Sequence, residues 1–382
     1  MTRLEVIGKA LSGSISWLDA AVVLGVSARQ MRRLRRRFEC FGKEGLLDGR
    51  RGLSRRRRIP DATVSELLRL RRELYTDFSI RHFHEHLVER HQLSLSYTFV
   101  RDLLQLRGLA DKCAGVGRYL RKRERRPLPG MLLHLDASTH EWIAGLPRQD
   151  LVVALDDADG RILFARFFPQ EGVASTMAAL LHVLREHGRF CQLYTDRGSH
   201  FCRTERAGSA PADEQHGQVS RVLRALGIEH LRAMTPEARG RSERCFGTLQ
   251  GRLPQELRLH GVSSYELANR YLEQTFIADF NRRFAVRPRE RGSAFSALSG
   301  VDLELLVSAQ HERIVQKDNT VVFGRLLLQL SPSPERMHYV RCPVLVHELV
   351  DDTLAASFHG KLIGRFDRQG TPLPLQHQRR VA

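Results

Sequence analysis

Three short apolar runs follow one another closely between residues 131 and 168, and their succession constrains the fold more than any other feature. The runs are MLLHLD, LVVAL and RILFARFF, and the polar turn DDADG separates the last two as in a hairpin. Two further runs, FCQLYT and IEHLRA, alternate with helical patterns. Helices are expected at 172–187, 217–226, 240–259 and 264–284. The order βββαβαβα predicts a mixed sheet flanked by helices.

The segment SWLDAAVVLGVSARQMRRLRRRF, which begins at Ser16, predicts two short helices around a tight turn at Gly25. Ser16 with Asp19, and Ser27 with Gln30, have the spacing of capping boxes that start helices. The apolar side chains of the second helix form one stripe, which leaves five arginines largely outside it: Arg29, Arg32, Arg33, Arg36 and Arg37. This pattern favours a helix-turn-helix that enters a DNA major groove, although a basic surface helix is the alternative.

The charge of the chain points to the same kind of partner. There are 61 Lys and Arg against 43 Asp and Glu, which gives a net charge of +18. Residues 29–58 hold thirteen basic and three acidic residues, so this short stretch carries much of the surplus. A strongly basic segment binds polyanions by releasing their counterions. We therefore expect double-stranded DNA as the partner, with Arg50 and Arg51 in the glycine-rich GLLDGRRG segment among the contacts.

A second helical unit follows, and changes in hydrophobic pattern and charge divide the rest of the chain. Ser79 and Ser96 have the positions of helix caps, and Gly108 stops the last helix of this unit. From about 318 the chain alternates again, which predicts a small antiparallel barrel or sandwich. The expected parts are a helix-turn-helix domain at 1–52, a basic linker at 53–60, a second helical DNA-binding domain at 61–112, a basic linker at 113–128, a catalytic core at 129–290, a linker at 291–317 and a small β domain at 318–382.

The positions of the cysteines and histidines argue against a fold stabilised by a zinc site or by disulfides. The six cysteines are scattered without a C-x-x-C pair. The stretch RHFHEH at 81–86 contains a His-x-x-x-His spacing, but a zinc half-site of that kind would need two cysteines nearby, and none are present. The chain also has no apolar stretch of about 18 residues and no signal-like N-terminus, so we expect a cytoplasmic, nucleoid-associated protein with no membrane partner.

Three carboxylates stand at positions that suit phosphoryl-transfer chemistry. Asp136 ends the first apolar run and Asp196 follows the fourth, and carboxyl ends of strands are where α/β folds place ligands. An Asp at such a junction also serves as ordinary turn chemistry. Asp156 and Asp157 are rivals to Asp136, but their place in the DDADG turn favours the turn role.

Glu243 lies in the segment EARGRSERCFGTLQGRL, among four arginines. Glu243 lies three residues before Phe246, at the start of the apolar stripe of its helix, so we expect its side chain to point inward. A buried carboxylate needs a partner, which is either a metal ion or a distant arginine. Arg241 and Arg244 flank it and are predicted either to contact DNA phosphates or to form salt pairs. Together, Asp136, Asp196 and Glu243 supply the hard oxygen ligands that one or two Mg²⁺ ions need.

The motifs LDAST, YTDRGSHF and ARGRSERCFGTLQGRL resemble those of the integrase-core transposases of bacterial insertion sequences, the DDE group. Gly240 to Arg244 match the family's final acidic motif, and the phrases GLLDGRRG and DFNRRFAVRP also resemble members. The resemblance covers residues 10–300 and implies an RNase H-like core. The gap of 47 positions between Asp196 and Glu243 exceeds the family's usual gap; a surface insertion at 203–217 accounts for it unless Asp213 or Glu214 is the ligand.

The resemblance implies a metal-dependent DNA transposase. Asp136, Asp196 and Glu243 would hold two Mg²⁺ or Mn²⁺ ions, which serve cleavage at element ends and transfer of the 3′-OH to target DNA. A homo-oligomer on DNA is expected because two element ends must be held together. Two alternatives stay open: a non-catalytic DNA-binding regulator derived from a transposase, and an RNase H-like nuclease acting on hybrids or junctions.

Overall fold

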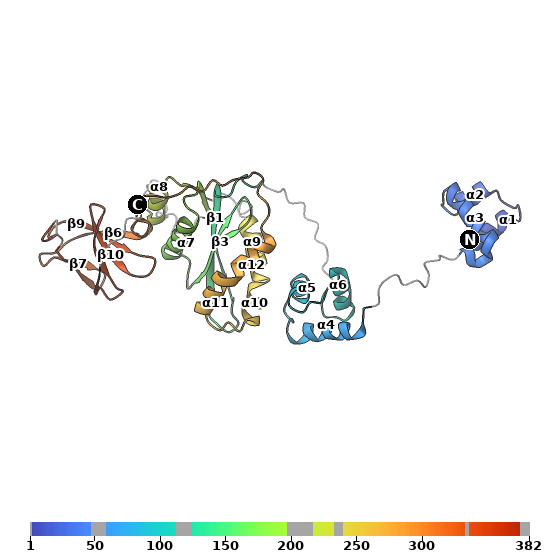
Figure 1. Ribbon diagram of the computed structural model, residues 1–382, viewed down its shortest axis with the longest axis horizontal. Helices are drawn as coiled ribbons and strands as arrows, with labels where there is room; N and C mark the ends of the chain where they lie inside the picture. The colour runs from blue at the N-terminus through green and yellow to red at the C-terminus, as the bar shows by residue number, and fades with distance from the viewer. Residues whose placement is uncertain are drawn as a thin grey trace, which may run out of the picture. The chain divides into compact units, whose positions relative to one another are not determined.

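A computed structural model of the protein describes residues 2–46, 59–111, 124–196, 217–232, 240–332 and 336–374. The chain divides into two compact units, Met1–Glu73 and Leu74–Ala382. Figure 1 labels the helices and strands of both units. Three predictions fall outside the described residues: the DNA contacts of Arg50 and Arg51, nearly all of the insertion at 203–217, and the rival ligands Asp213 and Glu214.

The first unit is helical throughout its described part. Its elements are α1 (Arg3–Leu11), α2 (Trp17–Val23), α3 (Ala28–Phe41), the 3-10 helix η1 (Gly42–Leu46) and α4 (Asp61–Glu73). The side chains of Ser16 and Ser27 cap α2 and α3, as predicted. Gly25 takes the left-handed conformation (φ 62°) that the tight turn requires. Helix α1, which was not predicted, contributes Val6 and Ile7 to the small apolar core under α2 and α3.

The second unit begins with a helical pair. Helix α5 (Ile80–Glu89) is capped by the Ser79 side chain, and α6 (Tyr97–Leu106) is capped by that of Ser96. Gly108 follows α6 with a φ of 66°, so the predicted stop is confirmed. These elements match the three-helix pattern expected after residue 61, with α4 as its first member.

A five-stranded mixed sheet forms the centre of the second unit. Its strands are β1 (Leu132–His140), β2 (Gln149–Asp156), β3 (Ile162–Phe168), β4 (Gln192–Thr195) and β5 (Glu229–Arg232), in the spatial order β3-β2-β1-β4-β5. The first three pair antiparallel, whereas β4 runs parallel to both β1 and β5. This order confirms the predicted mixed-sheet core and places β1 in the middle of the sheet.

Helices cover both faces of this sheet, as Figure 1 shows for α7 on one side and α9 and α12 on the other. The helices are α7 (Val173–Glu186), α8 (Gln218–Ala225), α9 (Gly240–Gln250), α10 (Leu253–Leu259), α11 (Tyr265–Tyr271), the π-helical segment η3 (Leu272–Phe276) and α12 (Ile277–Phe284). One apolar core joins Leu133 and Leu135 of β1 to α7 and α8, and another joins β2 and β3 to α9 through α12. The helix predicted over 240–259 is two helices, because the chain turns at Gly251 before Pro254 enters α10.

The C-terminal part is an antiparallel β structure without a closed barrel in the residues described. Its elements are α13 (Leu303–Leu306), β6 (Ala309–Ile314), β7 (Thr320–Phe323), β8 (Leu326–Gln329), β9 (Pro343–Glu348), β10 (Leu354–Phe358), β11 (Lys361–Phe366) and β12 (Pro372–Leu373). A sheet of order β12-β11-β10-β9-β6 and the hairpin β7-β8 share one apolar core. Because β6 pairs with β9, this sheet starts before the boundary predicted at 318. No described helix is long and apolar enough to span a bilayer.

Candidate active site

Strands β1 and β4 bring Asp136 and Asp196 to the same level of the sheet. Leu132 pairs with Gln192 and His134 with Tyr194 in parallel register, and Asp196 directly follows the last residue of β4, Thr195. Neighbouring strands lie about 4.8 Å apart, so extending this register by two residues leads from Asp196 to Asp136, which lies on one face of β1. That face is the one toward α9, because Leu133 and Leu135 point to the opposite core under α7. Two of the three predicted acids thus belong to neighbouring strands of the sheet.

Asp136 is almost buried in β1, with 8% of its surface exposed. The backbone N–H of Ala137 donates to its Oδ1 at 3.0 Å. Asp196 follows β4 directly and is half-buried. The Cys245 thiol on α9 interacts electrostatically with Asp136. Burial is the larger cause and the negative charge of Asp136 the smaller, and together they raise the pKa of that thiol to about 12. Helix α9 thus covers the strand beside Asp136.

Glu243 is exposed in the first turn of α9, which corrects the expectation of an inward side chain. The buried positions of this helix are Ser242, Phe246 and Leu249. Glu243 instead shares a stripe with Gln250, seven positions later. The Gln250 side-chain amide donates to Ser138 Oγ of β1 at 2.9 Å, and Ser138 points to the same face as Asp136. Glu243 therefore lies on the flank of α9 that reaches the β1 side chains, with its own carboxylate at the surface.

A second acidic cluster lies at the start of β1, where the DDADG turn meets the sheet. The Asp156 carboxylate accepts hydrogen bonds from the backbone N–H groups of Gly130 (2.7 Å) and Ala158 (2.8 Å). Burial nevertheless raises the pKa of Asp156 to about 6. Because this carboxylate is enclosed and bound by backbone, the turn role expected for Asp156 agrees with its contacts.

Asp157 is fully buried beside Asp156 and binds three groups. His134 donates Nε2–H to its Oδ1 at 2.8 Å, and the backbone N–H of Arg126 donates to Oδ2 at 2.7 Å. Arg241 forms an ion pair with it, at 2.9 Å between Nε and Oδ1. Burial opposes ionisation, but the His134 hydrogen bond, the Arg126 N–H and the Arg241 charge outweigh it and hold the pKa of Asp157 well below its usual range.

Of the two roles predicted for Arg241, the structure shows the salt pair, whereas Arg244 is exposed. Sequence reasoning missed the partner of Arg241 and also the role of His134. The one available signal was the alternation in LLHLD, which places His134 and Asp136 on the same face of one strand.

The arginines of α3 are arranged as predicted. Met31 and Leu34 are buried against α1 and α2. The five predicted DNA contacts on this helix are exposed: Arg29, Arg32, Arg33, Arg36 and Arg37. Arg35, by contrast, pairs with Glu39 at 2.7 Å along the helix. The exposed face of α3 is thus strongly basic, as a helix that enters a major groove requires.

Comparisons with known proteins agree with this arrangement. Residues 2–58 match the helix-turn-helix domain family. The chain is 30% identical over 364 residues to a protein of Sinorhizobium fredii named transposase y4bF, covering 94% of this chain and 79% of that protein. It is 27% identical over 377 residues to the transposase for insertion sequence IS1202 of Streptococcus pneumoniae, covering 89% and 80% respectively.

Solved structures that resemble the chain include the HTLV-2 integrase catalytic core domain in complex with magnesium. That match has a TM-score of 0.29 and 18% identity, and it covers 38% of this chain and 85% of the other. A second is a simian T-cell lymphotropic virus intasome in complex with the PP2A regulatory subunit B56 gamma. It has a TM-score of 0.36 and 14% identity, and it covers 78% and 98% of the two chains.

Proposed function

The chain belongs to the family of bacterial insertion-sequence transposases, and from that premise we propose that it binds the ends of a mobile element, cuts a DNA strand there and joins the freed 3′-OH to target DNA. The observation that supports this proposal is the parallel pairing of β1 and β4, the neighbouring strands to which Asp136 and Asp196 belong or are joined. We assign the third acidic role to Glu243, on the flank of α9 that reaches β1.

The donor chemistry of these residues fits a hard divalent cation. Asp136, Asp196 and Glu243 offer carboxylate oxygens, which Mg²⁺ and Mn²⁺ prefer. When bound, two such ions supply Lewis-acid stabilisation to the attacking and leaving oxygens of an in-line displacement. The neighbouring histidine, His134, directs its Nε2 to Asp157, so that nitrogen is engaged in the other acidic cluster.

The protein's own groups position this chemistry rather than react covalently. The β1 backbone fixes Asp136, and the Ala137 N–H orients its carboxylate. Glu243 is carried on a helix anchored to the sheet by Phe246 and Leu249, so its backbone is fixed although its side chain is exposed. Rigid placement of carboxylates that attract and orient phosphate-bound cations is the main contribution a protein makes to phosphoryl transfer.

Helix α3 supplies the DNA-binding function of the proposal. Its exposed arginines neutralise phosphates, and its N-terminal turn is the part that a helix-turn-helix presents to base edges. We propose Arg29, Arg32, Arg33, Arg36 and Arg37 as contacts to the element ends, and Arg244 as a contact near the reacting strand. We also propose that the protein works as a homo-oligomer on DNA, since cutting both element ends together requires two active sites.

The test is a strand-cleavage and strand-transfer assay with the full chain, Mg²⁺ or Mn²⁺, and DNA carrying the ends of its own element. Asp136→Asn, Asp196→Asn and Glu243→Gln are each expected to abolish both products while DNA binding persists. Glu273→Gln, an exposed acid on η3, is the matched control and should keep full activity. End binding without any metal-dependent product would select the regulator, and hydrolysis of hybrids without strand transfer would select the nuclease.

A further inference from the structure

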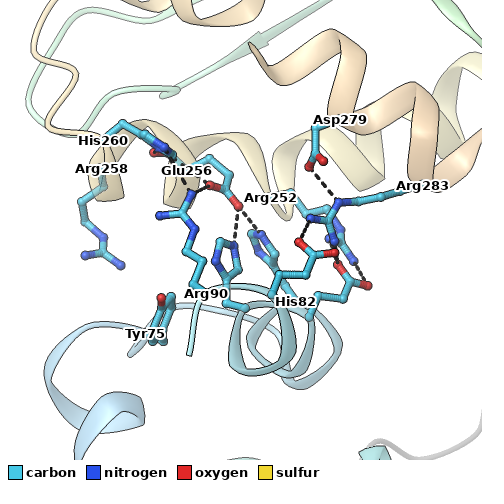
Figure 2. Close-up of polar contacts among 12 residues, drawn as sticks. Tyr75, His82, Arg90, Arg252, Glu256, Arg258, His260, Asp279 and Arg283 are labelled. Atoms are coloured by element: carbon cyan, nitrogen blue, oxygen red, sulfur yellow. Dashed lines mark hydrogen bonds and ion pairs between the residues drawn. The ribbon is translucent and has the colours of Figure 1, made fainter. Parts of the chain in front are cut away.

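Helix α5 carries two histidines that meet a glutamate from α10. His82 and His86 are one turn apart on the same face of the helix, with 2% and 4% of their surfaces exposed. The Nε2 atoms of both rings lie 2.7 Å from the same carboxylate oxygen, Oε1 of Glu256. Figure 2 shows His82 reaching up from α5 toward Glu256. Among the described residues, these three side chains form a group that could hold a metal ion, because their ligand atoms all lie within 4.8 Å of one another.

The chemistry of these three groups matches a transition-metal site. Two imidazole nitrogens and one carboxylate oxygen form the His₂Glu ligand set that binds Zn²⁺, with a further position left for water. The Nδ1 atoms of His82 and His86 are buried and have no hydrogen-bond partner among the described residues, so each ring makes its polar contact through Nε2 alone. Two imidazole nitrogens and one carboxylate oxygen therefore converge from helices far apart in the sequence.

The surroundings hold the ligands in place. Phe78 stacks on His82 with ring centroids 4.1 Å apart, and Tyr75 packs against His86 at 5.3 Å. The rings thus cannot turn freely away from Glu256. Arg90 lies 3.6 Å from Oε2, the other oxygen of the same carboxylate, and Oε2 is also 3.8 Å from His260 Nδ1. A nearby guanidinium opposes a dication, so the expected affinity is below that of a cysteine-rich zinc site.

We propose that His82, His86 and Glu256 bind one Zn²⁺ ion that fastens the α5–α6 helical pair to the catalytic core. The site is separate from the acids at β1 and β4 and uses none of them. Ion pairs around it join the same elements: Arg252 and Arg283 both bind Glu85 of α5, at 2.6 Å and 3.1 Å. Arg258 of α10 binds Asp77 at 2.6 Å. These ion pairs hold the two parts in contact, and the metal fixes the angle at which α5 and α6 meet the core.

The same contacts are also those of a hydrogen-bonded cluster without a metal, in which each imidazole donates Nε2–H to Oε1 of Glu256. The two accounts differ in what Glu256→Gln does. A glutamine carbonyl still accepts both hydrogen bonds, so a proton-only cluster keeps its geometry. A metal site loses its anionic ligand and with it most of its affinity. Glu256→Gln therefore separates them without removing packing volume.

The experiment titrates metal-stripped full-length protein with Zn²⁺, and with Co²⁺ as a visible-absorbing probe, followed by equilibrium dialysis. The reference protein carries Asp136→Asn and Asp196→Asn, so metal at the proposed active site does not contribute and failure of either proposal leaves the other intact. We expect one equivalent of Zn²⁺ per chain. Glu256→Gln and His86→Gln should weaken it by more than the roughly 10–100-fold that changes behind metal ligands cost.

The matched control is His84→Gln, on the same helix between the two proposed ligands. His84 Nε2 binds the Leu95 carbonyl at 2.7 Å, so this change should leave the Zn²⁺ affinity unaltered. Absence of a bound equivalent, or affinity unchanged by Glu256→Gln, overturns the proposal. Should a variant fail to fold, the X-ray absorption spectrum of the zinc-loaded reference protein decides: imidazole scattering supports the site, and its absence refutes it.

Discussion

Two acidic clusters lie against strand β1, and they are built in different ways. At the start of the strand, Asp156 and Asp157 are enclosed, and backbone N–H groups, His134 and Arg241 bind them. Further along, Asp136 lies within β1, and Asp196 directly follows the neighbouring strand β4. The first arrangement neutralises its charges internally. We propose that the second gathers negative charge, which is the condition for attracting cations.

The difference teaches which acids belong to folding and which to chemistry. A buried carboxylate that is fully bound by N–H groups and cations stabilises the structure, and changing it damages the fold. On our proposal Asp136 and Asp196 serve cation binding, so changing them should affect activity far more than stability. Each prediction below is a way to break or sharpen this distinction.

The largest effect is expected for the β1–β4 pair. Asp136→Asn should lower strand transfer on the order of 10³-fold or more, because it removes an anionic ligand whose contribution is several kcal/mol. The melting temperature should stay within about 2 °C of the wild type, since the amide keeps the shape of the carboxylate. Kinetic assays with Mg²⁺ and thermal unfolding measure the two effects. A large loss of stability would place Asp136 with the structural cluster instead.

The next effect is on stability, at the other cluster. Asp157→Ala should lower the free energy of unfolding by about 3–5 kcal/mol, because it leaves the buried Arg241 and His134 without their anionic partner. Urea unfolding measures the loss. Double replacement with Arg241→Met should recover part of it, since the uncompensated cation is then gone. A stable, inactive Asp157→Ala protein would break the comparison.

A smaller effect follows from the raised pKa of Asp156. Its folded-state pKa of about 6 exceeds the ordinary value of 3.8, so the folded state binds a proton more tightly than the unfolded chain. The stability it contributes is present below about pH 4 and is lost as the pH rises through 6, by about 3 kcal/mol in total. Asp156→Asn should remove this pH dependence. The measurement is the difference in unfolding free energy between variant and wild type at pH 4 and pH 7, and a difference that does not change with pH would contradict it.

The smallest effect concerns arginines, to which the same distinction applies. Arg33 is exposed on α3, whereas Arg35 is engaged with Glu39. Arg33→Gln should weaken binding to end DNA several-fold and lower the salt dependence by about one counterion. Arg35→Gln, the control on the same helix, should change binding less. Equal effects, measured by fluorescence anisotropy over a range of salt, would show that the ion pair with Glu39 does not keep Arg35 from contacting DNA.

Local features of the fold were predictable because they depend on neighbours in the sequence. The caps at Ser16, Ser27, Ser79 and Ser96 follow from spacing alone. The position of Asp136 did not follow: it was expected to end its strand, but β1 continues to His140 and Asp136 lies in the middle of it. The side of α9 on which Glu243 lies did not follow. Positions three and four before Phe246 both fit its apolar stripe, and packing selected Ser242 rather than Glu243.

Contacts between segments far apart in the chain could not be predicted from the sequence. The sequence argued against a zinc site at RHFHEH because no cysteines are nearby. The group that its His86 contacts, Glu256, lies 170 positions further along the chain and could not be found from spacing. Arg241 was similarly ambiguous until the turn after β2 placed Asp157 beside it. In both cases the missing information was which helix packs where, and that depends on the whole core.

The most direct test of the central claim is anomalous diffraction from crystals of the protein grown with Mn²⁺ and end DNA. The account predicts anomalous peaks within about 2.2 Å of carboxylate oxygens from Asp136, Asp196 and Glu243 together. Peaks at the two aspartates with Glu243 turned to solvent and roughly 10 Å or more away would contradict it, as would no peak at this edge of the sheet.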